Sequence, residues 1–315
     1  MGKVAFIFPG QGSQSVGMGK ELIEKEETCK EIFERANEKL GYNLTEIMHE
    51  GPEETLRRTE NAQPALVTMS VAVLKLFEEV NIRPDYVAGH SLGEYSALVA
   101  AGAIDFEDAV YAVRNRGLFM EEAVPFGEGS MAAVLGLERE KLEEISRSVQ
   151  DEYGEVAELA NLNCPGQIVL SGTAKGVEIA SEIAKEAGAR RVIPLQVSGP
   201  FHSSLMKPAA EKLKNVLAEI EIRDIDIPVI ANVSAEPVTN GEIIREQLIA
   251  QVYSPVLWED SVRKMIDLGV DTFVEIGAGN VLTGLVRKID RNVKAIAVSD
   301  REGVEKLRRA LEGEE

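Results

Sequence analysis

The chain has 315 residues, 44% of them hydrophobic, which is enough for one large domain or two unequal ones. Its 53 acidic and 34 basic residues give a net charge of −19, so we expect no binding to nucleic acid, which requires a basic face. With two cysteines, no apolar stretch of the roughly 20 residues that span a membrane, and no signal peptide, we expect a cytoplasmic enzyme or binding protein.

The first part of the chain alternates short strand patterns with amphipathic helices. This alternation is typical of an α/β fold with a mainly parallel sheet. The expected elements are a strand over 3–9, helices over 18–40 and 63–80, a buried strand at 85–89, and helices over 92–102 and 106–122.

Between residues 128 and 198 the pattern changes to β-α-β-β-α-β, the order of a ferredoxin-like fold. After this region the first pattern resumes, with strands expected at 228–233, 272–277 and 294–299, each followed by a helical segment. We therefore predict two domains. A small ferredoxin-like domain, 128–198, is inserted into a larger α/β domain formed by 1–127 and 199–315.

Ser91 stands in GHSLG, a G-x-S-x-G frame between a strand that ends at Ala88 and a helix that begins near Leu92. A sharp turn between strand and helix is the setting of a nucleophile elbow, where the helix N-terminus favours a developing negative charge. A serine that only caps the helix would fit the same position. The context favours catalysis, so Ser91 is the candidate nucleophile.

A serine nucleophile needs a base, and the chain has only three histidines. His90 is adjacent to Ser91 at a tight turn, where its side chain should point elsewhere, and His49 lies in a polar stretch that suggests the surface. His202 lies in SGPFHSS, a loop where the inserted domain rejoins the large one, and sites form in such loops. We predict that His202 is the base; the alternative is a buried structural histidine.

An oxyanion intermediate needs two backbone N–H donors. Leu92, the residue after the serine, supplies one. The glycine-rich turn FPGQGSQSVGMG could supply the other, because closely spaced glycines let backbone amides approach a ligand. It does not match a nucleotide loop, since it lacks the third glycine of G-x-G-x-x-G and Lys20 is followed by Glu21.

Arg116 lies in the helix expected over 106–122, and its helical neighbours at i±3 and i±4 are all apolar. A charged group in apolar surroundings needs a carboxylate partner. One interpretation is a salt bridge to another helix, and the other is a bidentate clamp for a substrate carboxylate. A hydrolase of simple esters would have no use for such a clamp.

The chain resembles the malonyl-CoA:acyl-carrier-protein transacylases of type II fatty acid synthesis over essentially its whole length. The resemblance rests on motifs that occur in the same order: FPGQGSQSVGMG, AQPAL, GHSLGEYSAL, RNRGLFM, NLNCPGQ, GPFHSSLM, YSPVLW and EIGAGNVL. It implies an α/β-hydrolase-like domain with a parallel sheet core and a ferredoxin-like insertion, in agreement with the α/β pattern of the sequence.

The resemblance also implies roles for the site residues. Ser91 would be the nucleophile and His202 its base, and the backbone carbonyl of Gln251 would orient that histidine in place of an acid. The amides of Gln11 and Leu92 would form the oxyanion hole. Arg116 would bind the free carboxylate of the malonyl group.

The implied reaction has two halves. Malonyl-CoA would acylate the serine, and the phosphopantetheine thiol of acyl carrier protein would then remove the malonyl group, with no metal or other cofactor. Carrier protein is acidic in this family, so a chain of charge −19 needs a local basic patch to receive it. The residues predicted for that patch are Arg190, Arg191, Arg287 and Lys288.

Two other functions remain compatible with the sequence. A serine thioesterase or esterase could use the same elbow, and it would release CoA rapidly without an acceptor. A non-catalytic docking module for acyl carrier protein could carry a relict site, although a relict should have lost at least one member of the Ser91, His202 and Arg116 set.

Overall fold

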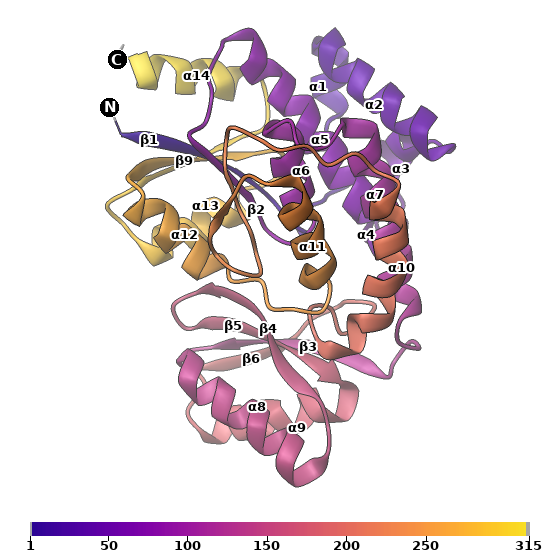
Figure 1. The fold of residues 1–315 in the computed structure, drawn as a ribbon, viewed down its shortest axis with the longest axis vertical. Coiled ribbons are helices and arrows are strands. Elements are labelled where there is room, and N and C mark those ends of the chain that lie inside the picture. Colours follow the sequence, from indigo (N-terminus) through magenta and orange to yellow (C-terminus); the bar gives the residue numbers. More distant parts are fainter. Residues whose placement is uncertain (1, 313–315) are drawn as a thin grey trace.

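The computed structural model describes residues 2–312 and contains a large sheet and a small sheet, the small one below the large one in Figure 1. The strands of the large sheet are, in spatial order, β10 (Lys294–Val298), β9 (Val270–Ile276), β1 (Lys3–Phe8), β2 (Tyr86–Gly89), β7 (Val229–Ile230) and β8 (Pro237–Val238). All neighbours run parallel except β7 and β8. The predicted mainly parallel sheet is therefore confirmed.

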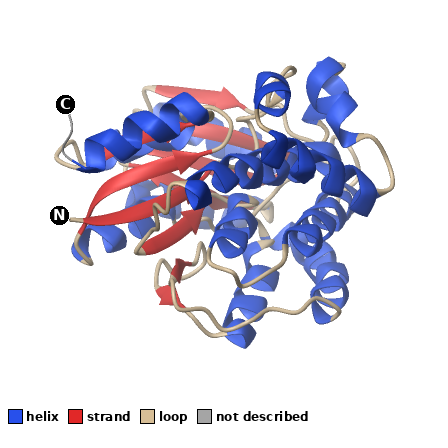
Figure 2. Cartoon of the chain, turned by 90° about the horizontal axis from the view of Figure 1, so that it is seen from above, coloured by secondary structure: helices blue, strands red, loops and turns tan. Residues whose placement is uncertain are grey.

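Helices cover both faces of this sheet (Figure 2). Along β1, Phe6 and Phe8 belong to one hydrophobic cluster, whereas Ala5 and Ile7 belong to another. Successive strand side chains point to opposite faces, so this alternation means that both faces are buried. The helices around the large sheet are α1 (Lys20–Lys25), α2 (Glu27–Leu40), α3 (Leu44–Glu50), α4 (Glu53–Arg57), α5 (Thr59–Glu79), α6 (Gly93–Ala100), α7 (Phe106–Glu122), α10 (Lys207–Ala218), α11 (Gly241–Gln251), α12 (Trp258–Asp267), α13 (Val281–Ile289) and α14 (Arg301–Glu312).

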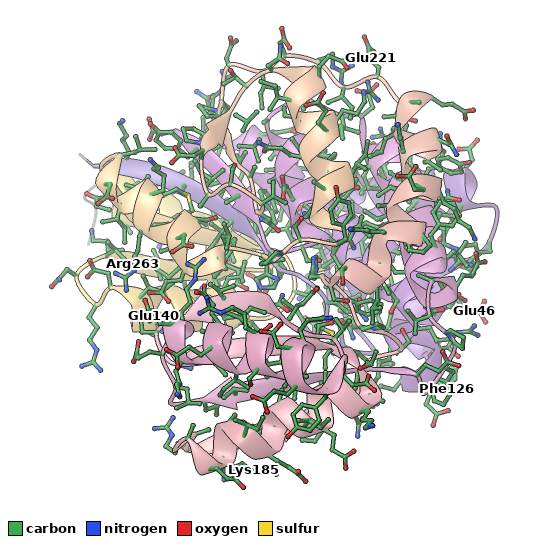
Figure 3. The ribbon with its side chains drawn as sticks, turned by 60° about the horizontal axis from the view of Figure 1, so that its bottom comes forward. Glu46, Phe126, Glu140, Lys185, Glu221 and Arg263 are labelled. Carbon is green, nitrogen blue, oxygen red and sulfur yellow. The ribbon has the colours of Figure 1, made fainter. Side chains whose placement is uncertain are left out.

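The small sheet follows the predicted β-α-β-β-α-β order. Its elements are β3 (Gly129–Leu135), α8 (Arg139–Tyr153), β4 (Ala157–Cys164), β5 (Gln167–Thr173), α9 (Ala174–Glu186) and β6 (Arg191–Pro194). The strands are antiparallel in the order β4-β5-β3-β6, which confirms the ferredoxin-like unit. Both helices lie on its outer side, where Glu140 and Lys185 point away from the sheet (Figure 3). The domain boundaries themselves stay a prediction.

The two sheets are linked through the edge strand β4. The Leu162 N–H donates to the carbonyl of Val256 at 3.0 Å, and the Val256 N–H donates to the carbonyl of Ala160 at 2.8 Å. Val256 follows α11, so this ladder joins the small sheet to a segment of the large unit. The contact brings β4 close to the carboxyl ends of β1 and β2, where ligands bind in open α/β sheets.

The single helix predicted over 18–40 is wrong, because the chain breaks between α1 and α2. Glu26 is extended, with φ −127° and ψ 103°, and its carboxylate pairs with Arg301 at 2.6 Å. The polar pattern continues across the break. The break therefore cannot be seen in the local sequence, because it depends on Arg301, which comes from the far end of the chain.

The helix predicted over 63–80 begins earlier, at Thr59, and contains Pro64. Proline has no N–H to donate to the carbonyl of Glu60, one turn before it. Arg114 Nη1 donates to that carbonyl instead, at 2.8 Å. A side chain from α7 thus satisfies the group that proline leaves open.

Two predicted strands are shorter than expected. The pattern over 228–233 yields only the two residues of β7, and the antiparallel β8 follows in place of a helix. The chain leaves the sheet because the Asn232 N–H donates to Glu94 Oε2 at 3.1 Å. The pattern over 191–198 stops at Pro194, and the residues after it line a cleft. Across residues 2–312, no helix has both the length and the apolar character needed to cross a membrane.

Candidate active site

A cleft of about 450 Å³ opens between the two sheets at the carboxyl ends of β1 and β2. The glycine-rich turn, the serine elbow, α5, α7 and β4 all contribute to its wall. Among its lining residues are Gln11, Gln63, Ser91, Arg116, Asn163 and His202. In the part of the chain that the structure describes, no cluster of three or more His, Cys, Asp or Glu side chains could hold a metal ion.

Ser91 sits on a sharp turn with φ 53°, a left-handed conformation that is uncommon outside glycine. The flanking glycines are needed because the backbone packs tightly here. A Cβ atom at Gly89 would lie 1.9 Å from the carbonyl carbon of Gly93, and one at Gly93 would lie 2.3 Å from the carbonyl oxygen of Phe8. The G-x-S-x-G frame thus lets β2, α6 and β1 approach closely, as a nucleophile elbow requires.

His202 is within hydrogen-bond distance of the serine. Its Nε2 lies 2.8 Å from Ser91 Oγ, and its Nδ1 lies 2.8 Å from the carbonyl oxygen of Gln251. The carbonyl can only accept, so Nδ1 carries the proton and Nε2 is left to accept from the serine hydroxyl. Burial, and then the charge of Arg116, lower the pKa of His202 to about 3, so the ring is neutral at pH 7.

Arg116 is 1% exposed and points into the same site. Its Nη1 donates to Gln63 Oε1 at 2.7 Å, and its Nη2 donates to Ser91 Oγ at 3.0 Å and to Gln251 Oε1 at 2.9 Å. Among the ion pairs of residues 2–312, none involves this guanidinium. The interhelical salt bridge considered from the sequence is therefore absent within this range, and burial lowers the pKa of the arginine.

The two amides expected to form an oxyanion hole lie on segments that touch. Leu92 directly precedes α6, and the turn that carries Gln11 packs against the elbow, since a Cβ at Gly10 would lie 2.6 Å from the His90 carbonyl oxygen. Neither the Leu92 N–H nor the Gln11 N–H has an acceptor within residues 2–312. The two groups are therefore free to donate to a ligand.

Within residues 2–312 neither of the other two histidines hydrogen-bonds to Ser91, although His90 also lines the cleft. His90 Nε2 is 2.8 Å from Asn163 Oδ1, and its ring packs 5.7 Å from that of Trp258, so it holds the turn against β4. The expectation that His49 lies on the surface is wrong. It is half-buried, and its ring packs 5.8 Å from the ring of Phe33 because α3 packs on α2.

Three residues of the site were missed by the sequence reasoning. Gln63 holds Arg116, and Asn232 Oδ1 accepts from the Ser91 N–H at 2.8 Å. Glu94 lies behind the elbow, buried and bonded to Asn232 and to Gln251. Asn232 follows the carboxyl end of β7, so its place in the chain was a usable signal.

Three of the basic residues predicted as a patch lie along one end of the small sheet, where β3 ends and β5 and β6 begin, whereas Arg287 donates to the Ala295 carbonyl of β10 at 2.8 Å. Leu135 of β3 is paired with Arg191 on one side and with Gln167 on the other, and Lys288 Nζ donates to Gln167 Oε1 at 3.1 Å. None of the four forms an ion pair with a carboxylate of residues 2–312. The four residues are Arg190, Arg191, Arg287 and Lys288.

The chain is similar to known acyltransferases. The model of the acyl transferase domain matches residues 5–313. The malonyl CoA-acyl carrier protein transacylase of Bacillus subtilis is 61% identical over 97% of this chain and 96% of that protein. The acyl carrier protein S-malonyltransferase structure from Vibrio cholerae has a TM-score of 0.94 at 44% identity, covering 97% of this chain and 99% of the other. A malonyl-transacylase solved in complex with its type II PKS acyl-carrier protein is 42% identical, with a TM-score of 0.94 and 99% coverage of both chains.

Proposed function

Because the chain belongs to the malonyl CoA-acyl carrier protein transacylases of the acyl transferase family, we propose that it transfers malonyl from malonyl-CoA to acyl carrier protein. The observation that carries this proposal is the placement of Arg116. A buried guanidinium with no ion-pair partner among residues 2–312 lies 3.0 Å from the hydroxyl of a serine, and that hydroxyl lies 2.8 Å from a histidine that can act as its base. In an acyl group with a free carboxylate, the carboxylate would bind Arg116 while the acyl carbon bonds to Ser91.

The first half of the reaction forms a malonyl ester on Ser91. His202 Nε2 takes the hydroxyl proton while Oγ bonds to the thioester carbonyl carbon, and the Gln11 and Leu92 amides donate to the oxyanion. The carbon–sulfur bond then breaks, and His202 returns the proton to the leaving CoA sulfur. Arg116 holds the malonyl carboxylate throughout.

The second half reverses this chemistry with a different thiol. His202 takes the proton of the phosphopantetheine thiol, whose sulfur attacks the ester carbonyl carbon. The Ser91 oxygen leaves and regains a proton from His202. The carbonyl of Gln251 keeps the histidine in the tautomer that both halves need, in place of the acid of a hydrolase triad.

We place the carrier protein on the basic patch formed by Arg190, Arg191, Arg287 and Lys288. The patch reaches from β6 to the start of β5, and β5 pairs with β4, which lines the cleft through Asn163. Positive charges that form no ion pair with a carboxylate of residues 2–312 would attract an acidic partner that the rest of this acidic chain repels. Cys29 and Cys164 are buried free thiols, which supports the predicted cytoplasmic location.

The function is tested by brief incubation with malonyl-CoA, followed by intact-protein mass spectrometry and peptide mapping. We expect a malonyl adduct on Ser91 and none in Ser91→Ala. Rapid CoA release without an adduct or an acceptor would instead support a thioesterase. Absence of both adduct and CoA release would support the non-catalytic docking module.

A further inference from the structure

Glu94 is a buried carboxyl group directly behind the elbow, and the reaction proposed for Ser91 gives it no role. It is 2% exposed and lies in the first turn of α6, where its N–H donates to the Ser91 carbonyl at 3.0 Å. Its Oε2 accepts from Gln251 Nε2 at 2.8 Å and from the Asn232 N–H at 3.1 Å. Carboxyl groups are seldom fully buried without such partners, so the placement needs a reason.

The side-chain amide of Gln251 lies between Glu94 and Arg116. Its Oε1 accepts from Arg116 Nη2 at 2.9 Å, and its Nε2 donates to Glu94 Oε2 and, at 2.9 Å, to the Ser91 carbonyl. The reversed amide would place its NH₂ against the guanidinium and its oxygen against two acceptors. The acceptors on Glu94 and on the Ser91 backbone therefore both favour the orientation in which the amide oxygen faces Arg116, and Glu94 supplies the shorter of the two bonds.

The backbone of Ser91 is held by Asn232 and Gln251, which contact it directly. Asn232, whose N–H is bound by Glu94, accepts from the Ser91 N–H at 2.8 Å and donates through Nδ2 to the Gly89 carbonyl at 2.7 Å. Gln251 holds the Ser91 carbonyl. A left-handed serine persists only where its surroundings restrain it, and these direct contacts of Asn232 to the Ser91 N–H and the Gly89 carbonyl restrain it without the Glu94 side chain.

We propose that Glu94 is a positioning residue that orients the Gln251 amide, which in turn directs the Arg116 guanidinium toward the carboxylate of the acyl group. This inference rests on the proposed function, because it assumes that Arg116 binds malonyl. The proposal predicts that a change at Glu94 affects one acyl group more than another. Transfer of malonyl depends on the direction of the guanidinium, whereas transfer of acetyl, which has no carboxylate, does not.

Two substitutions of Glu94 distinguish the effect of its side-chain length from the effect of its charge. Glu94→Gln keeps the chain length and an acceptor oxygen but removes the charge. Glu94→Asp keeps the charge but withdraws the acceptor by one methylene. Burial raises the pKa of Glu94 to about 7, so a neutral acceptor already occurs in the native protein, and we expect Glu94→Gln to transfer malonyl within about threefold of wild type.

For Glu94→Asp we expect kcat/KM for malonyl transfer to fall about 10- to 100-fold, with acetyl transfer changed by less than about threefold. In a Gln251→Met background the amide is gone, so adding Glu94→Asp should cause little further loss of malonyl transfer. Glu186→Asp, an exposed residue at the end of α9, is the matched control and should have no effect. Thermal unfolding of each variant checks the fold, and Glu94→Met replaces Glu94→Asp if that variant is unfolded.

Equal losses of malonyl and acetyl transfer in Glu94→Asp would overturn the inference, as would additive effects in the double variant or equal damage in Glu94→Gln. A wild-type enzyme that forms no malonyl adduct would count against the proposed function instead. A wild-type enzyme that transfers malonyl, with unchanged acyl selectivity in every Glu94 variant, would count against the role of Glu94 alone.

Discussion

At the residue scale, the arrangement of charge around Ser91 supports the proposed binding of a carboxylated acyl group. Arg116 is held by three neutral oxygens, from Gln63, Gln251 and Ser91 itself. No carboxylate of residues 2–312 lies within ion-pair distance of Arg116, so a substrate carboxylate would be the only anion paired with it in this range. Bidentate pairing with a guanidinium is both directional and strong where water is excluded.

Removing this guanidinium should therefore change acyl selectivity. For Arg116→Ala we expect kcat/KM for malonyl transfer to fall about 100- to 1,000-fold, because two charged hydrogen bonds are lost, while acetyl transfer falls less than about tenfold. Arg114→Ala is the matched control, since Arg114 lies two residues away and bonds to Glu60 and Asn61 outside the site. Equal losses for both acyl groups in Arg116→Ala would reduce it to a structural residue.

The lowered pKa of His202 predicts an unusual pH dependence. A histidine with its ordinary pKa of 6.5 would lose its activity as a base below neutral pH, whereas this ring stays neutral until about pH 3. We expect the single-turnover rate of Ser91 malonylation to change less than about threefold between about pH 8 and pH 5. A rate that falls with an apparent pKa near 6.5 would contradict this environment for the histidine.

The same shift affects stability, with a definite sign. Below pH 6.5 the unfolded chain binds a proton at His202 and the folded chain does not, so this contribution to stability is complete above pH 6.5. It is lost as the pH falls from 6.5 toward about 3. In His202→Gln the free energy of unfolding, measured by denaturant titration, should depend less on pH between 6.5 and about 3 than in the wild-type protein.

At the element scale, the elbow depends on how closely α6 approaches β1. We expect Gly93→Ala to lose about 1–3 kcal/mol of stability and most of its malonylation, because the new Cβ would lie 2.3 Å from the Phe8 carbonyl oxygen. Gly284→Ala in α13 meets nothing within 4 Å and should be neutral or stabilising by up to about 1 kcal/mol. Equal melting temperatures for the two variants would argue against this packing.

Site residues could be predicted where their contacts are local in sequence, and not where their partners are far away along the chain. Ser91 was predictable because its turn, glycines and helix are local in sequence, and His202 because few histidines were available. Glu94 was not, since its partners Asn232 and Gln251 lie 138 and 157 residues away. Orientation of the base by a backbone carbonyl leaves no side-chain signal, so that role came only from the family resemblance.

The same reasoning applies to the elements. Strand and helix patterns predicted the mainly parallel sheet and the β-α-β-β-α-β order, because burial on one or two faces leaves a periodic trace. The break at Glu26 and the short β7 were not predictable. Each depends on one partner brought close by the finished fold, Arg301 in the first case and Glu94 in the second.

At the scale of the whole molecule, a chain of net charge −19 would repel a carrier protein as acidic as the family resemblance implies, and we therefore proposed that docking is restricted to the basic patch. Charge reversal in the patch, as in Arg191→Glu with Lys288→Glu, should raise KM for carrier protein about tenfold while leaving malonylation by malonyl-CoA unchanged. Arg83→Glu, an exposed residue just before β2 of the large sheet, is the control. An unchanged KM in the double variant would place the docking surface elsewhere.

The central claim is that Ser91 passes malonyl to a thiol and not to water. Its most direct test isolates the malonyl-enzyme, mixes it with holo-carrier protein or with buffer, and follows the acyl group by mass spectrometry over the same interval. We predict that malonyl moves to the carrier thiol within seconds while the buffer sample keeps its adduct. Release of free malonate at a similar rate in both samples would contradict the claim and identify a hydrolase.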